Sequence, residues 1–208
     1  MIGQIRTYTI NKGMMEDWIA LYNSELYPRN IALGIDVPVV SVNDDNTQFI
    51  WIRIFKDAED LKSQEALLYG SDWWNNNVNR VRSHIAHRNI QIIKPSTDLT
   101  STKISGHSVA HLRTYTINKG MLSNWLNLFQ TELYGRVRET QMGMPVLSVN
   151  DEDTKFIWIR TYKDEDDLKT KEEAFYGSDY WVANVEQIRG HLADRNIQNI
   201  CLINPKQS

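Results

Sequence analysis

The sequence contains few of the features that mark secreted, membrane or disulfide-bonded proteins. Its single cysteine, Cys201, cannot form a disulfide within the chain. No apolar run approaches the roughly 18 residues that a membrane-spanning helix needs, and strand-like sequence begins almost at Met1, which leaves no room for a signal peptide. We therefore expect a cytoplasmic protein that makes no membrane contact.

Several classes of partner and catalyst are also excluded by what the sequence lacks. The chain has 23 Lys and Arg against 26 Asp and Glu, a formal net charge of −3, so no nucleic-acid partner is expected. It has neither a glycine-rich phosphate loop nor a GxSxG elbow, which argues against nucleotide-dependent enzymes and α/β-hydrolases. Without a cysteine pair or clustered histidines, we predict no metal site.

What the sequence does contain is an internal duplication. The segment Arg6–Met14 (RTYTINKGM) returns letter for letter at Arg113–Met121, and the same register holds without a gap to Ile93 and Ile200, with about half of the paired positions identical. A period near one hundred residues is too long for a solenoid repeat. Each copy is therefore a small domain.

A domain of this size buries only about 60 to 70% of its unfolded surface and is marginally stable by itself. We predict domains at 1–95 and 109–208, joined by a Ser/Thr-rich linker at 96–108. We expect the two to pack together as an intrachain pseudo-dimer, the covalent equivalent of a symmetric homodimer. Further homodimerisation of this pseudo-dimer is an open alternative.

Hydrophobic periodicity predicts the order strand, helix, strand, strand, helix, strand in each copy. The first helix carries apolar residues at helical spacing, and we expect a less regular stretch after it, up to Pro38. A polar helix ends at Gly70, and a further helix begins at Ser71, a good N-cap residue. The strands expected in the first copy are 4–10, 39–42, 49–55 and 89–93.

The order βαββαβ is typical of the ferredoxin-like fold, an α+β fold in which an antiparallel four-stranded sheet has helices on one face. The other face of such a sheet is left uncovered. Two ferredoxin-like domains packed sheet to sheet would cover each other and form a pseudo-dimeric α+β barrel, which explains why a duplication is useful.

Three motifs carry a resemblance to a known family. The opening at Arg6 (RTYTINKG), the WIR strand at Trp51 and the helix entry at Tyr69 (YGSDWW) resemble the NIPSNAP family, within the dimeric α+β barrel superfamily, and they recur in the second copy. The resemblance implies the barrel fold. Members of the superfamily include cofactor-free monooxygenases, muconolactone-type isomerases and haem proteins, whereas NIPSNAP proteins have no agreed chemistry, so the resemblance implies the fold more than the reaction.

Alternation along the third strand separates two faces. Ile50, Ile52 and Ile54 share one face, and Trp51 and Arg53 share the other with two phenylalanines. We expect the isoleucine face to lie under the helices. The face with arginine and aromatic residues would then point into the space between the two sheets.

Arg6 and Tyr8 share one face of the first strand, which would bring a second arginine to the same interior. A buried guanidinium needs a partner. One alternative is a protein carboxylate, with Glu25 and Glu132 as candidates, and the other is the anionic group of a ligand held by the arginine fork.

Two histidines, His84 and His191, occupy matched positions in the two copies. Each is open to three interpretations: a general base, a haem ligand, or a residue that bonds a nearby backbone carbonyl. Trp73 and Tyr180 lie on the same helix face as these histidines. The copies differ most near residues 30–37, which indicates either specialisation of one pocket or drift in exposed loops.

These patterns predict a small-molecule site inside the barrel. The protein would bind or transform a small anionic or aromatic metabolite, by proton transfer or cofactor-independent oxidation in the manner of a monooxygenase or isomerase. The alternatives are a haem- or ligand-binding protein without catalysis and a non-catalytic interaction module; no cofactor is predicted, and haem belongs only to the first alternative. The candidate catalytic residues are Tyr8, Tyr115, His84 and His191. The candidate ligand-binding residues are Arg6, Trp51, Arg53, Arg113, Trp158, Arg160, Trp73 and Tyr180.

Overall fold

The computed structural model describes residues 1–96 and 104–204, so most of the predicted linker lies outside the described residues. The described chain forms two compact units, one of residues 1–95 with 201–204 and one of residues 96–200. The second unit ends before the predicted domain 109–208 does. The backbone N–H of Ile203 donates to the carbonyl of Val40 at 2.8 Å, which attaches the last residues to the first unit.

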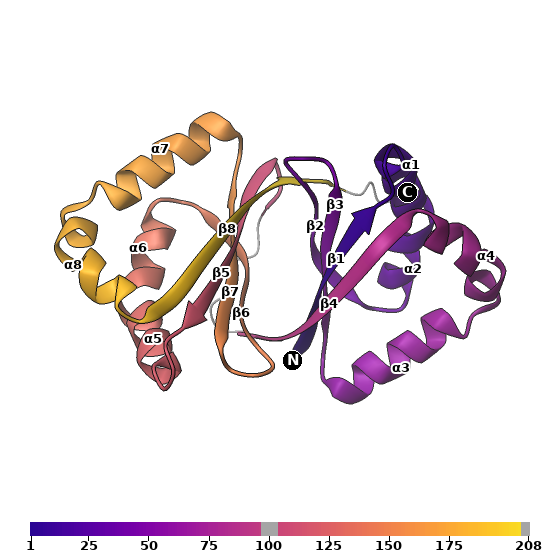
Figure 1. Ribbon diagram of the computed structural model, residues 1–208, viewed down its shortest axis with the longest axis horizontal. Helices are drawn as coiled ribbons and strands as arrows, with labels where there is room; N and C mark the ends of the chain where they lie inside the picture. The colour runs from indigo at the N-terminus through magenta and orange to yellow at the C-terminus, as the bar shows by residue number, and fades with distance from the viewer. Residues whose placement is uncertain (97–103, 205–208) are drawn as a thin grey trace. The chain divides into compact units, whose positions relative to one another are not determined.

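The first unit is a four-stranded antiparallel sheet in the order β4-β1-β3-β2. Its helices lie on one side of that sheet (Figure 1). Its elements are β1 (Ile2–Ile10), α1 (Met15–Leu21), the π-helical turn η1 (Tyr22–Leu26), α2 (Tyr27–Ala32), β2 (Asp36–Asn43), β3 (Gln48–Phe55), α3 (Ala58–Tyr69), α4 (Asp72–Ser83) and β4 (Ile85–Pro95).

The second unit repeats this architecture, with the strand order β8-β5-β7-β6. The predicted βαββαβ order is therefore confirmed in both copies. Its elements are β5 (Val109–Ile117), α5 (Leu122–Leu128), the π-helical turn η2 (Phe129–Leu133), α6 (Tyr134–Glu139), β6 (Gly143–Asn150), β7 (Lys155–Tyr162), α7 (Glu165–Tyr176), α8 (Asp179–Arg189) and β8 (Leu192–Leu202).

Local side-chain hydrogen bonds set the ends of these elements. In the predicted hairpin, Asn43 Oδ1 accepts from the backbone N–H groups of Thr47 at 2.9 Å and Gln48 at 2.8 Å, which closes the turn between β2 and β3. At the start of α4, Ser71 Oγ accepts from the backbone N–H of Trp74 at 3.2 Å, as the N-cap prediction requires.

The stretch after the first helix is more regular than predicted. The chain stays helical through η1 to the end of α2, so the expectation of an irregular stretch is wrong. The π turn is the reason, because it shifts the register and interrupts the 3.6-residue pattern. In η1, Ser24 Oγ donates to the carbonyl of Ala20 at 2.7 Å. In η2, Thr131 Oγ1 donates to the carbonyl of Asn127 at 2.9 Å in the same way.

The face of β3 that carries arginine and aromatic residues lies under the helices of its own unit. Phe49 and Trp51 belong to the same core cluster as Trp18 and Tyr22 of α1 and η1. The prediction that this face points between the two sheets is wrong. The helices contribute aromatic rings as well as aliphatic side chains, and these rings pack edge to face against the sheet, with Trp18 and Phe49 5.7 Å apart.

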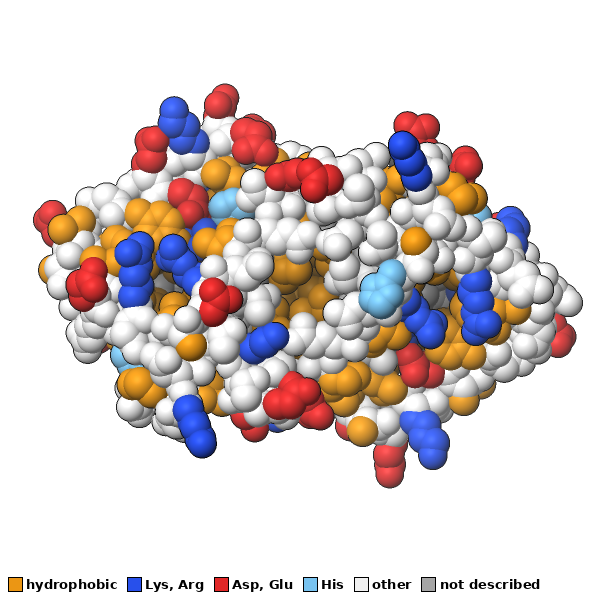
Figure 2. Space-filling model, in the orientation of Figure 1, with side chains coloured by type: hydrophobic (Ala, Val, Ile, Leu, Met, Phe, Trp, Pro, Cys, Tyr) orange, Lys and Arg blue, Asp and Glu red, His pale blue; other side chains and the backbone are white. Residues whose placement is uncertain are grey.

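The surface of the described chain carries both signs of charge. Figure 2 shows acidic and basic side chains interspersed over the viewed face, with hydrophobic side chains between them. Within residues 1–96 and 104–204, no helix is long and apolar enough to cross a membrane.

We predict that Gly143→Ala lowers the free energy of unfolding by about 1–3 kcal/mol. A Cβ at Gly143 would collide with Oγ1 of the fully buried Thr161, whose hydroxyl is held by His107 Nδ1 at 2.7 Å. Urea denaturation followed by tryptophan fluorescence would measure the change. As a control, Asp36→Ala at the matched exposed position should shift stability by no more than about 0.5 kcal/mol. Equal stability of Gly143→Ala and the parent would contradict this packing.

Candidate functional site

In the first unit, two buried arginines share one carboxylate. Arg6 and Arg53 are 2% and 0% exposed. Arg53 pairs with Glu65 of α3, and Arg6 Nη1 lies 3.4 Å from the same Oε1 atom. Gln4 Oε1 accepts from Arg6 at 2.7 Å and from Arg53 at 2.6 Å. Both guanidinium groups are therefore hydrogen-bonded within the protein, but they share one counter-charge, so the cluster keeps a net positive charge.

The second unit builds the same pair with different neighbours. Arg113 donates to both carboxylate oxygens of Glu172 at 2.9 Å, and Arg160 donates to one of them at 2.8 Å. The hydroxyl of Tyr162 donates to Glu172 as well. His111 Nδ1 lies 3.0 Å from Arg113 Nη2, and because arginine can only donate, this ring nitrogen accepts.

The prediction that Glu25 and Glu132 partner the buried arginines is wrong. Glu25 instead accepts from Trp73 Nε1 at 2.9 Å and from Arg80 at 2.6 Å, both on α4. Burial and the nearby charge of Glu132 raise the pKa of Tyr180 on α8. Glu25 therefore ties one helix to another and Glu132 faces α8, whereas the acids that reach the sheet come from α3 and α7.

Burial and ion pairing act in opposite directions on Glu172. Burial by itself would raise its pKa, but Arg160 and Arg113 outweigh burial and hold the pKa below its usual range. Burial raises the pKa of Tyr162, so this phenol stays protonated and donates to the carboxylate. The cluster is thus a charged carboxylate surrounded by donors.

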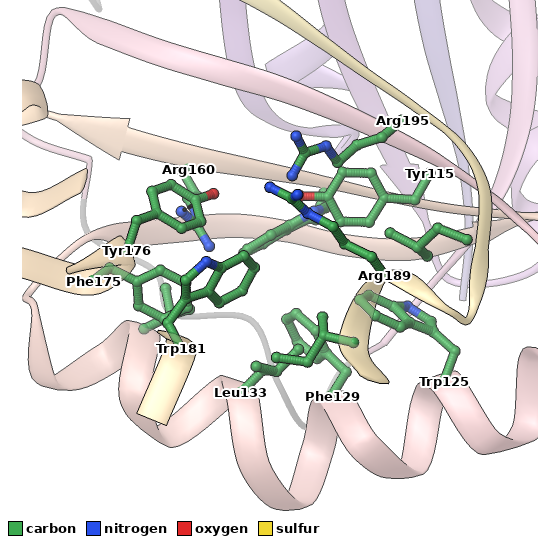
Figure 3. Close-up of a pocket in the computed structure, with 14 residues that line it drawn as sticks. Tyr115, Trp125, Phe129, Leu133, Arg160, Phe175, Tyr176, Trp181, Arg189 and Arg195 are labelled. Carbon is green, nitrogen blue, oxygen red and sulfur yellow. Dashed lines mark hydrogen bonds between the residues drawn. The ribbon is translucent and has the colours of Figure 1, made fainter. Parts of the chain in front are cut away.

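Each unit has a narrow pocket between its sheet and its helices, and we name these the first and second pockets after their units. The cavity volume is about 20 Å³ in the second pocket and about 40 Å³ in the first, so the walls of either pocket must move apart to admit a ring. Rings from both layers form the walls of the second pocket (Figure 3). These aromatic residues are Trp125, Phe129, Trp158, Phe175, Tyr176 and Trp181.

Two exposed arginines stand at the second pocket. Arg189 ends α8 and Arg195 lies on β8, and Figure 3 shows both guanidinium groups pointing toward the hydroxyl of Tyr115. Neither guanidinium has a hydrogen-bond or ion-pair partner within the described parts of the chain. The site therefore combines aromatic walls with unneutralised positive charge.

The first pocket repeats this arrangement at matched positions. Its lining includes Tyr8, Trp18 and Trp51, with Arg82 and Arg88 in the places of Arg189 and Arg195. These four arginines were missed in the sequence analysis. The signal that could have found them is that both copies keep them, in VRSHIAHRN and IRGHLADRN.

Several buried donors in the pockets have no acceptor in the structure as described. They include the indole N–H groups of Trp125 and Trp158 and the Nε of Arg160, all of which belong to residues that line the second pocket. In the first pocket the buried indole N–H groups of Trp18 and Trp51 likewise have no acceptor among the described residues. A buried donor without an acceptor is costly, so these groups favour a ligand that supplies acceptor oxygens.

The matched histidines do not reach the pockets. His84 Nδ1 bonds the carbonyl of Arg80 at 2.8 Å, and His191 Nδ1 bonds that of Gln187 at 2.9 Å. Neither histidine lines the first or the second pocket. Among the described residues, the lining of these two pockets includes no histidine, cysteine or methionine. The two histidines that the haem alternative relied on are therefore not placed to hold a haem in either pocket. In the described ranges, no group of three or more His, Cys, Asp or Glu residues could hold a metal ion.

The structure thus divides the predicted site residues into three sets. Six of them line the pockets: Arg6, Tyr8, Trp51, Tyr115, Trp158 and Arg160. Two more, Arg53 and Arg113, share the glutamates of the same clusters. The remaining four are bonded elsewhere, namely His84, His191, Trp73 and Tyr180.

Comparison with known proteins supports the fold. No family model matches the chain, and no curated protein matches its sequence. A "putative monooxygenase" from Lactobacillus acidophilus is similar over 99% of this chain and 94% of its own, with a TM-score of 0.73 and 14% identity. Another from Fusobacterium nucleatum is similar over 98% and 92%, with a TM-score of 0.69 and 11% identity. The predicted α+β fold class is confirmed over nearly the whole chain.

The chain is also similar to solved NIPSNAP proteins over about one unit. One from Agrobacterium tumefaciens covers 46% of this chain and 86% of its own, with a TM-score of 0.42 and 21% identity.

We predict that Glu172→Gln destabilises the protein by about 3–5 kcal/mol at neutral pH, since it leaves two buried arginines without a counter-charge. Because the folded-state pKa of Glu172 is lowered, its contribution is present above about pH 4.3 and is lost as the pH falls through the lower folded value. Unfolding free energies between pH 2 and pH 7 should therefore fall less steeply on acidification in the variant.

The exposed neighbour provides the control for this measurement. Glu173→Gln removes the same charge from α7 without touching the arginine pair, and should leave the acid-dependent loss of stability intact. If both variants lose the same amount of stability on acidification, the ion pairs of Glu172 with the buried arginines are not the origin of the pH dependence.

Proposed function

We propose that each unit binds a small organic anion with an aromatic ring in the pocket between its sheet and helices. The observation that carries this proposal is the pair of unneutralised arginines, Arg189 and Arg195, beside a pocket walled by aromatic rings. An arginine fork matches the geometry of a carboxylate, and the rings supply a flat apolar surface. The same combination in the first pocket supports two sites per chain.

The inner part of the pocket favours one further feature of the ligand. The buried N–H donors of Trp158 and Arg160 have no acceptor within the described protein. They favour a carbonyl, enolate or phenolate oxygen at the inner end of the ligand. The proposed ligand class is therefore an aromatic carboxylate, to which a further oxygen at the inner end adds affinity.

Proton transfer is the chemistry that the lining residues support best. The hydroxyl of Tyr115 accepts from Arg113 at 3.2 Å, and that of Tyr8 accepts from Arg6 at 2.8 Å, which leaves each phenol proton free to be donated. Burial raises the pKa of Tyr8, which keeps it protonated. We propose that these tyrosines donate to a ligand oxygen. The similar folds described as monooxygenases favour cofactor-independent oxidation as the related reaction class.

A non-catalytic module is the second candidate, and one observation favours it. Each of the four buried arginines lies against Glu65 or Glu172, one shared carboxylate in each unit, so each has a partner within the protein without a ligand. The exposed arginines distinguish the two candidates, because a purely structural role gives no reason for them in both pockets. We also propose, for either candidate function, that the protein is a member of the NIPSNAP family and lies in the cytoplasm.

We predict that 2-naphthoate binds the intact chain at two sites, measured by isothermal titration calorimetry. Arg189→Met combined with Arg195→Met should remove one site, and Arg82→Met combined with Arg88→Met the other, each weakening its site by about tenfold or more because a charge-assisted bond is lost. Native mass spectrometry of freshly purified protein would show any ligand that is retained, with its stoichiometry.

A matched control uses an exposed arginine outside the pockets. Arg138→Met in α6 removes the same charge and should leave both sites unchanged. Full binding by the doubly substituted proteins would overturn the proposed site.

A further inference from the structure

We infer that the two pockets of the chain select different ligands: the first accepts a longer ring system with a hydroxyl placed at Asn30, and the second a shorter one without a polar group at the matched Val137. This inference rests on the proposed function, because it assumes that both pockets bind an aromatic anion. It depends on differences between matched residues that line the inner parts of the two pockets.

Size is the first difference. Leu68 of α3 lines the first pocket, and Phe175 of α7 stands at the matched position in the second. Val81 is likewise matched by the larger Ile188. All four side chains are buried, so the extra carbon atoms occupy interior space. The cavity volume accordingly falls from about 40 Å³ in the first pocket to about 20 Å³ in the second.

Polarity is the second difference. Asn30, 1% exposed, lines the first pocket, and the fully buried Val137 replaces it in the second. The amide nitrogen of Asn30 donates to the carbonyl of Leu26 at 2.7 Å, and its oxygen receives only a long contact of 3.5 Å from Arg53. That oxygen keeps capacity to accept from a ligand hydroxyl. The second pocket offers only methyl groups at this point.

The buried arginine that faces the ligand also changes between the units. Arg6 lines the first pocket, whereas Arg160 lines the second. Arg6 Nε is bonded to a tyrosine hydroxyl at 2.8 Å, but the Nε atoms of Arg113 and Arg160 have no partner among the described residues. The donors presented to the inner end of a ligand therefore differ in number and position.

The outer parts of the two pockets are the same. The arginine pair and the tyrosine occupy matched positions in both units. Loss of function in one copy would remove these residues first, because exposed arginines contribute little to stability. Retention of the anion-binding end together with change at the inner end indicates separate specificities.

The test uses two probes and exchanges one residue between the units. Calorimetric titration of the intact chain should show two sites for 2-naphthoate and one for the longer anthracene-2-carboxylate. Leu68→Phe should weaken the anthracene-2-carboxylate site by about tenfold or more, and Phe175→Leu should create a second such site. Each substitution introduces the residue that the matched position already holds, and the large-to-small Phe175→Leu is the informative variant if Leu68→Phe fails to fold.

Three results would overturn the inference. Two equivalent sites for anthracene-2-carboxylate, or no change of stoichiometry in Phe175→Leu, would show that the pockets do not differ in selectivity while the proposed function stands. Absence of binding by both probes would remove the proposed function and the inference with it.

Discussion

Each unit depends on one carboxylate held between two buried arginines. A sheet face that carries two guanidinium groups cannot be covered by an apolar helix surface, because the charges would lack partners. Glu65 of α3 and Glu172 of α7 solve this problem, and by doing so they fix these helices against their sheets. The aromatic residues around the ion pairs then fill the remaining space between helices and sheet.

The same ion pairs define what is left for a ligand. Because the inner arginines are hydrogen-bonded by the protein, they position the tyrosine hydroxyls and the pocket walls. Exposed charge without a partner lies at the ends of α4 and α8 and on β4 and β8, where exposed arginines meet the openings. A site of this kind suits an amphipathic anion, with its ring between helices and sheet and its charged group outward.

Duplication within one chain allows the two copies of a site to diverge. A homodimer must carry any substitution in both pockets. In this chain the two copies differ, with Asn30 and Leu68 in the first copy matched by Val137 and Phe175 in the second. Such changes cost little in stability when the core around them adjusts its volume. Two specificities in one protein are then attainable without loss of the shared fold.

The sequence by itself determined the duplication, the strand and helix order, the hairpin turn and the cap at Ser71, because these depend on local periodicity and local hydrogen bonds. Only the tertiary structure decided which face of β3 the helices cover. Alternation separates Trp51 from Ile52, but both are buried, so hydrophobicity does not distinguish the two faces. The choice of Glu65 over Glu25, and the meeting of Arg82 with Tyr8 at one pocket, likewise depend on residues distant in sequence, and no local pattern encodes their proximity.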